Sequence, residues 1–293
     1  MRERTLLRGR AGWPERFEHL QQPPQRIWIA GSARPRLPAV AVVGSRLATP
    51  AGVDIARSIG RGLAGAGAQV ISGMARGIDG AAHHGAVDGG GETIAVLGCG
   101  IDVCYPAEHA RLRRAILTSG CVISEEPPGT PPLKHHFPKR NRLIAALAQA
   151  VVVVEATPNS GALSTARWAV DLGREVLAVP GSIRSPQSEG TNLLIRDGAR
   201  PYLGFGDLLD ALPELGPLLP LPIDAKSAEQ RISHRLAPEL AEILTRMGST
   251  PVLPDELAAT LGLSAAVVAS RLGSLELEGA ILSLPGGRVA RTF

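Results

Sequence analysis

The feature that most constrains this chain is a regular alternation of short, uninterrupted apolar runs with segments of helical spacing. The helical patterns cover residues 50–66, 78–89, 108–118, 138–149 and 161–172. Apolar runs that alternate with helices are typical of a parallel sheet with helices on both faces. We therefore predict an α/β fold with a Rossmann-like, doubly wound, mostly parallel sheet. The expected strands are Ile27–Ala30, Ala39–Val43, Gln69–Ser72, Thr93–Leu97, Cys121–Ser124, Val151–Glu155 and Glu175–Val179.

The chain is expected to divide into four parts. Residues 1–38 are predicted to form an N-terminal arm and lead-in strand, and residues 39–211 the Rossmann-like domain. Residues 212–235 carry four prolines with little periodicity, so we expect a linker there. Residues 236–293 show helical patterns near 238–247, 253–261 and 265–278, followed by two apolar runs around the Pro285-Gly286-Gly287 turn. Three helices and a hairpin predict a small C-terminal winged-helix domain.

Charge gives only a weak indication of the partner. The chain has 31 Lys and Arg against 27 Asp and Glu, a net charge of +4. All but three of the basic residues are arginine, which binds phosphate with a planar fork and stacks on bases, although a GC-rich coding bias explains this composition equally well. The winged-helix segment has four basic and six acidic residues. This balance disfavours a conventional duplex-binding regulator.

The cysteines and histidines do not indicate a metal site. The three cysteines, Cys99, Cys104 and Cys121, lack metal-ligand spacing and are expected to be reduced and buried. The pairs His83-His84 and His135-His136 lack supporting carboxylates, so neither a metal ion nor a cofactor is expected. No signal-peptide pattern or membrane-length apolar run is apparent. We expect a cytoplasmic protein.

Two glycine-containing loops follow the strands expected at 39–43 and 69–72. The first contains Gly44-Ser45-Arg46, and the second runs from Gly73 to Arg76-Gly77. Glycine lets backbone N–H groups approach an anion, and helix N-termini favour negative charge. In an open parallel sheet, ligands bind outside the carboxyl ends of the strands. The two loops together favour phosphate binding, whereas either loop alone is equally well explained as a tight turn.

A basic segment at residues 134–142 opens the fourth expected helix of the sheet domain. Lys139, Arg140 and Arg142 would each oppose the helix dipole by about 0.3–1 kcal/mol, and an external anion would relieve this conflict. Phe137 lies among these charges, and a base stacked on it would contribute about 1–3 kcal/mol without sequence preference. The alternative is that Phe137 packs against the helix start and the cations form a solvated face.

The loop after the strand at 151–155 is expected at the same edge of the sheet. Ser160 and Gly161 are small enough for a ligand to approach the backbone. Glu155 could serve as a catalytic carboxylate, although an isolated glutamate is more often a scaffold residue. Neither paired carboxylates nor a Ser-His-Asp or Cys-His arrangement is evident, so we assign no catalytic residue and expect a binding protein, not an enzyme.

Several motifs together carry a family resemblance. They are Val43-Gly44-Ser45-Arg46, Ser72-Gly73 to Asp79, Ala95 to Gly100, Phe137-Pro138 with Arg140-Asn141-Arg142, Glu155-Ala156 with Ser160-Gly161, and Val179-Pro180-Gly181. Motifs this numerous and in this order resemble the DNA-processing protein A family, also called DprA or Smf. The resemblance covers about residues 14–210, and the winged-helix segment fits the family as well.

The resemblance implies a Rossmann-like domain that binds single-stranded DNA, dimerises and promotes loading of the RecA recombinase in natural transformation. It also implies that the short N-terminal arm lacks the helical module that some members carry in front. Dimer contacts would involve Leu193, Tyr202 and Leu203. With the two glycine loops, the expected DNA site comprises Gly44, Ser45, Arg46, Gly73, Arg76, Lys134, Phe137, Lys139, Arg140, Asn141, Arg142, Ser160 and Gly161.

The main alternative is an enzyme, a nucleoside-monophosphate phosphoribohydrolase on a related Rossmann-like sheet. Its glycine-rich loop places a glutamate three residues after a threonine. Here Thr165 is followed by Ala166-Arg167-Trp168, with tryptophan in place of the acid. Hydrolysis would therefore lack its catalytic carboxylate.

Overall fold

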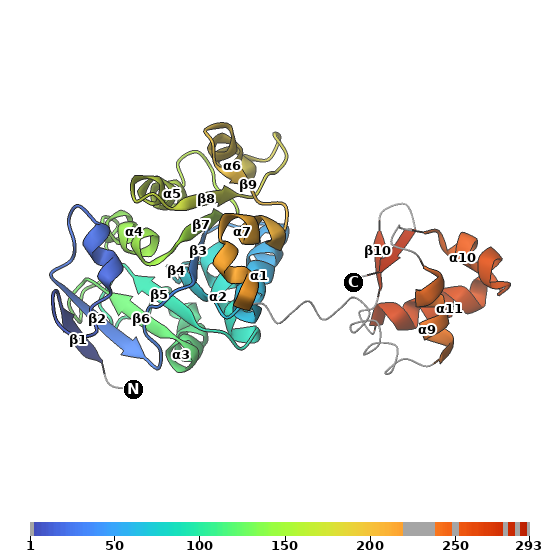
Figure 1. The fold of residues 1–293 in the computed structure, drawn as a ribbon, viewed down its shortest axis with the longest axis horizontal. Helices are drawn as coiled ribbons and strands as arrows, with labels where there is room; N and C mark the ends of the chain where they lie inside the picture. Colours follow the sequence, from blue (N-terminus) through green and yellow to red (C-terminus); the bar gives the residue numbers. More distant parts are fainter. Residues whose placement is uncertain (1–2, 219–237, 248–251, 278–280, 285–287, 292–293) are drawn as a thin grey trace. The chain divides into compact units, whose positions relative to one another are not determined.

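A computed structural model describes residues 3–218, 238–247, 252–277, 281–284 and 288–291. The chain forms two compact units, residues 1–219 and 220–293, each described here by itself. The first unit is built on a nine-stranded sheet (Figure 1). The predicted α/β fold with a mostly parallel, doubly wound sheet is confirmed.

The elements of the first unit follow the predicted alternation closely. Its strands are β1 (Arg4–Leu7), β2 (Arg26–Gly31), β3 (Ala39–Val43), β4 (Gln69–Ser72), β5 (Thr93–Leu97), β6 (Cys121–Ser124), β7 (Ala150–Val153), β8 (Glu175–Ala178) and β9 (Arg200–Pro201). Its α-helices are α1 (Pro50–Gly65), α2 (Ile78–Asp88), α3 (Ala110–Ser119), α4 (His136–Leu147), α5 (Gly161–Asp171), α6 (Pro186–Arg196) and α7 (Phe205–Ala211). Its 3-10 helices are η1 (Glu15–His19), η2 (Ala107–His109) and η3 (Pro213–Leu218).

The order of the strands places a switch point in the middle of the sheet. Across the sheet the order is β1-β2-β6-β5-β4-β3-β7-β8-β9, and all neighbours from β6 to β9 are parallel. From β3 the chain proceeds through β4 and β5 to β6 on one side, and then returns to β7 on the other. The carboxyl ends of β3 and β7 therefore border the crevice where ligands bind in such folds.

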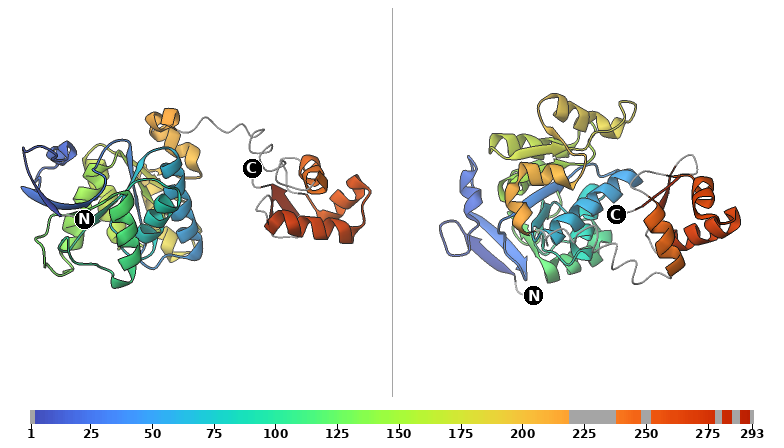
Figure 2. Two further views of the ribbon diagram at one scale, coloured as in Figure 1. Left: turned by 90° about the horizontal axis from the view of Figure 1, so that it is seen from below. Right: turned by 45° about the vertical axis from the view of Figure 1, so that its right-hand side comes forward.

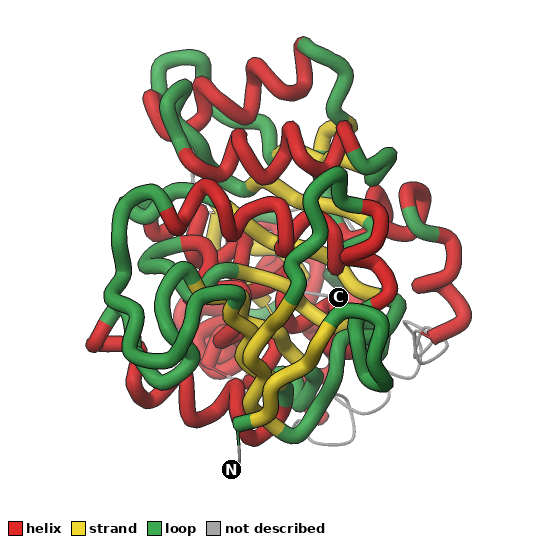
Figure 3. Tube along the Cα trace, turned by 90° about the vertical axis from the view of Figure 1, so that its left-hand side faces the viewer, coloured by secondary structure: helices red, strands yellow, loops and turns green. Residues whose placement is uncertain are grey.

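Helices cover both faces of the sheet (Figures 2 and 3). On one face, alternate residues of the central strands pack against α4, α5 and η1, as Val43 and Val153 do against Leu143 and Ala166. On the other face, the intervening residues pack against α1, α2 and α7. Strands buried on both faces read as continuous apolar runs. The predicted strands were recognisable for this reason.

The interpretation of residues 1–38 as an arm is corrected by the structure. β1 pairs with β2, and β2 pairs antiparallel with β6, so both strands extend the sheet. Between them, Trp13, Phe17 and Leu20 are buried in the core that includes α4. These aromatics supply apolar contacts that the arginine-rich composition of the segment hides. The short strands β1 and β9 and the helices α6 and α7 were also absent from the sequence-based expectation.

The second unit has the elements of a winged helix. Helices α9 (Pro238–Arg246), α10 (Pro254–Leu261) and α11 (Ala265–Leu277) precede a hairpin of β10 (Ile281–Leu284) and β11 (Arg288–Arg291). Ile243, Leu257, Leu272 and Val289 belong to its separate core. The expected linker at 212–235 lies largely outside the described residues, apart from its first part in η3.

No single helix among the described residues has both the length and the apolar character needed to cross a membrane. Helices α10 and α11 meet these two criteria only as a pair, and their axes bend by 115° at the break between them.

Candidate functional site

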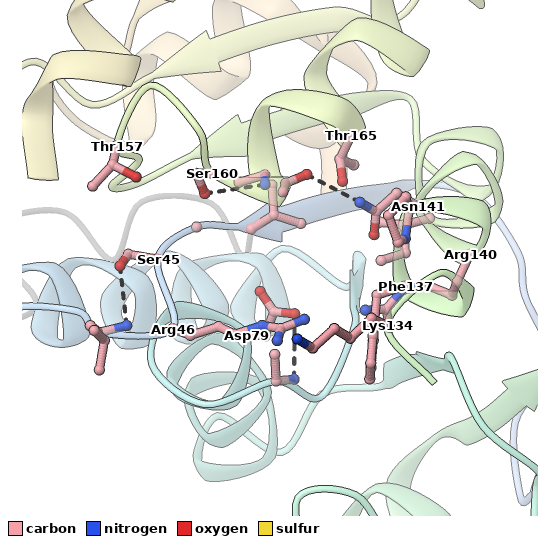
Figure 4. Close-up of a pocket in the computed structure, with 18 of the residues that line it drawn as sticks. Ser45, Arg46, Asp79, Lys134, Phe137, Arg140, Asn141, Thr157, Ser160 and Thr165 are labelled. Atoms are coloured by element: carbon pink, nitrogen blue, oxygen red, sulfur yellow. Dashed lines mark hydrogen bonds between the residues drawn. The ribbon is translucent and has the colours of Figure 1, made fainter. Parts of the chain in front are cut away.

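A pocket of about 700 Å³ lies at the switch point, outside the carboxyl ends of β3 and β7 (Figure 4). Loops after β3, β4, β5, β6 and β7 contribute to it, together with the first turns of α2, α4, α5 and α6. Nine of the predicted DNA-site residues line the pocket, namely Gly44, Ser45, Arg46, Lys134, Phe137, Arg140, Asn141, Ser160 and Gly161. The others, Gly73, Arg76, Lys139 and Arg142, do not line it.

The loop after β3 is held from both sides by backbone contacts. The Ser45 N–H donates to the Glu155 carbonyl at 2.7 Å, and the Ser45 carbonyl accepts from the Ile78 N–H at 3.2 Å. Gly77 has φ +70°, and a Cβ there would lie 2.3 Å from the Ser45 carbonyl oxygen, so only glycine fits. The loops after β3, β4 and β7 therefore form one connected rim, which fixes where Arg46 leaves the backbone.

Glu155 has a structural part in this rim. Its carboxylate accepts hydrogen bonds from the Thr49 N–H and hydroxyl at 2.9 and 2.5 Å. Thr49 is the N-cap of α1 and accepts from the Gly52 N–H at 3.1 Å. A carboxylate near a helix N-terminus is favoured by the helix dipole. The sequence left open whether Glu155 is a catalytic carboxylate or a scaffold residue, and its contacts fit a scaffold residue.

Phe137 brings two arginines from distant parts of the chain together. The Arg46 guanidinium carbon lies 4.8 Å from the centre of the Phe137 ring, and that of Arg140 lies 6.0 Å from it. Both distances are in the range of cation–π attraction. Arg46 is exposed, and Lys134 reaches the same part of the pocket from the loop before α4 (Figure 4). Neither Arg46 nor Lys134 forms an ion pair within the described part of the chain.

Arg140 is almost fully buried, with 5% of its surface exposed, and fixes the floor of the pocket. Its Nη1 donates to the carbonyl oxygens of Gly73, at 2.9 Å, and Val96. A Cβ on Gly73 would lie 2.4 Å from that nitrogen, so glycine makes room for the guanidinium. Burial lowers the Arg140 pKa to about 10, with Asp79 opposing the shift, so the side chain remains cationic at neutral pH.

Asp79 uses the backbone N–H groups that the sequence had suggested for phosphate. Its Oδ2 accepts from the Gly73 and Ala75 N–H groups at 3.1 and 3.4 Å. Burial raises the pKa of this carboxyl, against the attraction of Arg140. The prediction that the second glycine loop offers free amides to an anion is wrong, because an internal carboxylate already occupies them. The glycine is needed for Arg140 instead.

The conflict between basic residues and the α4 dipole is also resolved within the protein. The Arg142 guanidinium donates to both oxygens of Glu125 at 2.7 and 2.6 Å. The Lys139 ammonium lies 2.9 Å from a Glu126 oxygen and 3.6 Å from Glu125. The two glutamates directly follow β6 and supply the negative charge that we had expected from a ligand. Lys139 and Arg142 are therefore placed away from the pocket by their acidic partners.

Polar groups of α4 and α5 complete the upper wall in Figure 4. The Asn141 side-chain amide donates to the Gly161 carbonyl at 3.1 Å, which ties α4 to the start of α5. Ser160 is the N-cap of α5 and accepts from the Ala162 N–H at 3.3 Å. A Cβ on Gly161 would meet no heavy atom within 4 Å, so a ligand can reach the backbone there.

Arg76, like Gly73, belongs to the β4–α2 loop but lies outside the pocket. It is exposed and paired with Glu108 of η2. Several lining residues were missed from the sequence, among them Tyr105, Thr157 and Gln187. Gln187 belongs to α6, which was not predicted. Tyr105 had a usable signal, because aromatic residues make up only 3% of the chain and this one stands before a proline in an expected turn.

The residues expected at a dimer interface have different surroundings. Leu203 is 76% exposed and Leu193 lines a second groove, of about 610 Å³, which α5, β8 and α6 border. Tyr202 is only 9% exposed and packs in the core with α1 and α7, so it is not available for a contact between subunits. Its burial raises its pKa to about 12. The expectation for Tyr202 is corrected because its ring is needed inside the fold.

The residues that bear on the hydrolase alternative make contacts within the protein. Trp168, which stands where a phosphoribohydrolase would have its acid, packs partly buried against the α4–α5 core. Asp79 lines the pocket but is committed to backbone amides and Arg140. Among the described residues, no group of three His, Cys, Asp or Glu side chains is arranged to hold a metal ion.

Comparison with known proteins indicates the family of this chain. The family model "DNA recombination-mediator protein A" matches residues 4–213, and the model "DprA winged helix domain" matches residues 227–287. Protein Smf of Escherichia coli is 40% identical over 253 residues, which are 85% of this chain and 67% of that protein. A Mycobacterium tuberculosis protein carrying the DprA name is 42% identical over 267 residues, and the match spans 66% of its length.

Two solved structures resemble the first unit. DNA processing protein A of Streptococcus pneumoniae superposes with a TM-score of 0.66 and 38% identity, covering 71% of this chain and 73% of that one. The Helicobacter pylori protein, described with its single-stranded DNA binding mode, gives a TM-score of 0.65 and 29% identity, covering 72% of this chain and 96% of that one. The chain belongs to the DNA recombination-mediator protein A family, also known as DprA or Smf.

Proposed function

We propose that the pocket at the switch point binds single-stranded DNA with little sequence preference. The observation that carries the proposal is the convergence of Arg46, Lys134 and Arg140 around Phe137, where Arg46 and Lys134 form no ion pair among the described residues. Cations follow the phosphates of a strand, and aromatic faces take its bases. The single-stranded DNA bound by the Helicobacter pylori relative supports the same substrate.

The arrangement accounts for weak sequence preference. Phosphate contacts position a strand without reading its sequence, and every base has a face that can stack on an aromatic ring. Glu125 and Glu126 withdraw Lys139 and Arg142 from the pocket, so we propose a narrower DNA site than the sequence suggested. Its members are Gly44, Ser45, Arg46, Lys134, Phe137, Arg140, Asn141, Ser160 and Gly161.

The biological setting follows the family. We propose that the protein protects incoming single strands and promotes RecA loading in the cytoplasm, without catalysing a reaction of its own. Formation of a homodimer belongs to the same proposal, with the α5–α6 groove and Leu193 as the contact region.

The first test compares binding of an oligothymidylate with binding of a duplex of the same length. Single strands are expected to bind more tightly. With the two accessible cations, Arg46 and Lys134, on the phosphates, the slope of log affinity against log salt should be about −1.4, since each contact contributes roughly −0.7. Equal or tighter binding of the duplex would contradict the proposal. Release of free base from nucleoside monophosphates would support the hydrolase alternative.

The second test removes one pocket cation. Arg46→Ala should weaken single-strand binding and make the salt slope about 0.7 less steep, because the side chain is exposed and its loss leaves the fold intact. Arg61→Ala serves as the control, because it removes an exposed arginine of α1 that does not line the pocket. If Arg46→Ala and Arg61→Ala bind single strands with the same affinity, Arg46 does not contact the DNA.

A further inference from the structure

Tyr105 is the exposed aromatic residue of the pocket. It lies in the turn between β5 and η2, lines the pocket and is 38% exposed. Among the described residues it is the one Phe, Trp or Tyr side chain that is exposed, whereas Phe17 and Tyr202 are buried. Leaving an aromatic ring in water gives up the apolar contacts that stabilise a fold. Its position therefore suggests a ligand.

Phe137, in contrast, is already engaged by the protein. Arg46 lies over its ring, and Arg140 lies within 6.0 Å of the ring centre. A Cβ on Gly98 would be 3.0 Å from the ring, so the β5 loop packs closely against it. A base reaches Phe137 only after Arg46 moves, or it stacks on the Arg46 guanidinium itself. Tyr105 offers its exposed surface without such a rearrangement.

The two rings form a bent surface. Their centres are 5.7 Å apart and their planes are inclined by 43°. Consecutive bases in a duplex are nearly parallel and follow each other at about 3.4 Å along the axis. Two neighbouring bases that each lie flat on one of these rings must therefore be unstacked from one another. A single strand can adopt this geometry, and a paired one cannot.

The cationic side chain of Arg76 lies near Tyr105, outside the pocket. Arg76 pairs with Glu108, which follows Tyr105 by three residues in the chain, and both partners are about half exposed. Tyr105 lies near enough to Arg76 for ionisation of its hydroxyl to raise the Arg76 pKa, after the larger effect of Glu108. An exposed ion pair of this kind contributes only about 0–1 kcal/mol, so a phosphate can take the place of Glu108 at small cost.

We propose that Tyr105 is a second stacking surface beside Phe137, and that the strand leaves the pocket past Tyr105 toward Arg76. The site then holds two consecutive unpaired bases followed by a phosphate, and Arg76 regains a role outside the pocket. This inference rests on the proposed single-strand binding and adds its path and its number of bases.

The test measures the affinity of three Tyr105 variants for an oligothymidylate. Tyr105→Ala should bind about 5- to 150-fold more weakly, which corresponds to the loss of one base–aromatic stack, with an unchanged salt slope. Tyr105→Phe should bind like the unmodified protein, since stacking needs the ring and not the hydroxyl. Tyr105→Leu keeps apolar packing against Phe137 but has no aromatic face, so it should bind nearly as weakly as the alanine variant.

A strand without bases separates stacking from a structural role. For an oligomer of abasic deoxyribose phosphates, Tyr105→Ala should make no difference, whereas a disturbed pocket would weaken both ligands. Arg76→Ala should make the salt slope about 0.7 less steep with either ligand. Trp28→Ala is the control, because it removes a half-buried ring that does not line the pocket.

The possible failures are distinguishable. Unchanged oligothymidylate binding by Tyr105→Ala, together with weaker binding by Arg46→Ala, would overturn this inference and leave the proposed function standing. Recovery of binding in Tyr105→Leu would also overturn it, since packing alone would then suffice. If the unmodified protein does not prefer single strands, the proposed function itself fails.

Discussion

At the scale of single residues, the side chains of the pocket have either structural or ligand-facing surroundings. Arg140 is held by two carbonyl groups and is nearly inaccessible, whereas Arg46 is exposed and in contact with Phe137. The sequence alone does not distinguish the roles of these two arginines. Burial and hydrogen bonding separate the residue that shapes the floor from the one that can follow a ligand.

A substitution of Gly73 tests whether Arg140 must occupy its position in the floor of the pocket. Gly73→Ala would place a methyl group 2.4 Å from the Arg140 Nη1, so we expect a loss of about 1–3 kcal/mol in unfolding free energy, typical of overpacking. Displacement of Arg140 should also weaken binding of single strands. The matched control is Gly161→Ala, whose Cβ meets nothing within 4 Å and whose stability should be unchanged or slightly higher. Denaturant titration measures both, and equal stabilities would show that the floor adapts.

His83 introduces a pH dependence of stability, although it does not line the pocket. It is fully buried, its Nδ1 lies 2.6 Å from the Thr93 hydroxyl, and its Nε2 has no partner within the described structure. The Thr93 hydroxyl donates to the Val70 carbonyl, so Nδ1–H is the donor to threonine. Burial, together with nearby His109, His84 and Arg140, lowers the His83 pKa from 6.5 to about 3. In the folded protein the His83 ring is therefore neutral.

The sign of the effect follows from this lowered pKa. Below pH 6.5 the unfolded chain takes up a proton at His83 that the folded chain rejects, so stability falls as the pH decreases toward 3. The slope from this group is at most about 1.4 kcal/mol per pH unit. His83→Leu should flatten the unfolding free energy measured between pH 7 and pH 4.5, relative to the unmodified protein. A variant with the same slope would show that other groups cause the acid sensitivity.

At the scale of elements, α4 shows how the end of one strand determines the face of a helix. The glutamates after β6 hold Arg142 and Lys139, while the first turn of α4 presents Phe137 and the loop before it presents Lys134 to the pocket. The basic run at residues 134–142 is therefore divided between two sides of one helix. Only the side of α4 toward β3 and β7 faces the proposed binding site for single-stranded DNA.

Glu125→Gln should destabilise the fold without weakening DNA binding. It would leave the guanidinium of Arg142 largely buried and without its charged partner, which costs about 3 kcal/mol, the lower end for a broken buried pair. Lys139→Met removes a half-exposed partner of the same glutamates and should cost less than about 1 kcal/mol. Thermal unfolding and oligothymidylate titration of both variants check this. A loss of affinity in Lys139→Met similar to that in Arg46→Ala would return Lys139 to the binding site.

At the scale of the whole molecule, the α5–α6 groove bears on the proposed homodimer. Val170 lines the groove and is 66% exposed, next to Leu193 and Leu194. In a two-fold symmetric dimer the same patch is used by both copies. A charge placed there is therefore opposed by the same charge of the second copy.

Val170→Glu should convert a dimer to a monomer in sedimentation velocity at micromolar concentration. Ile183→Glu is the control, because Ile183 is 94% exposed and does not line the groove. A monomeric unmodified protein would contradict the proposed dimer. Dissociation by Ile183→Glu alone would move the interface to the loop before α6.

The sequence by itself determined the seven strands from β2 to β8 and the helices α1 to α5 between them, because strands buried on both faces must be apolar throughout and the helices between them must keep a 3.6-residue period. It also pointed to nine of the residues that line the pocket. Only the tertiary structure decided which basic residues face the pocket. The loop after β6 brings Glu125 and Glu126 against Arg142 and Lys139, and Arg140 reaches the carbonyls of Gly73 and Val96, which lie 67 and 44 residues away in the chain. The tertiary structure likewise decided that Trp13 and Phe17 belong to the core and Tyr105 to the pocket, since burial depends on what packs against a side chain and not on its neighbours in sequence.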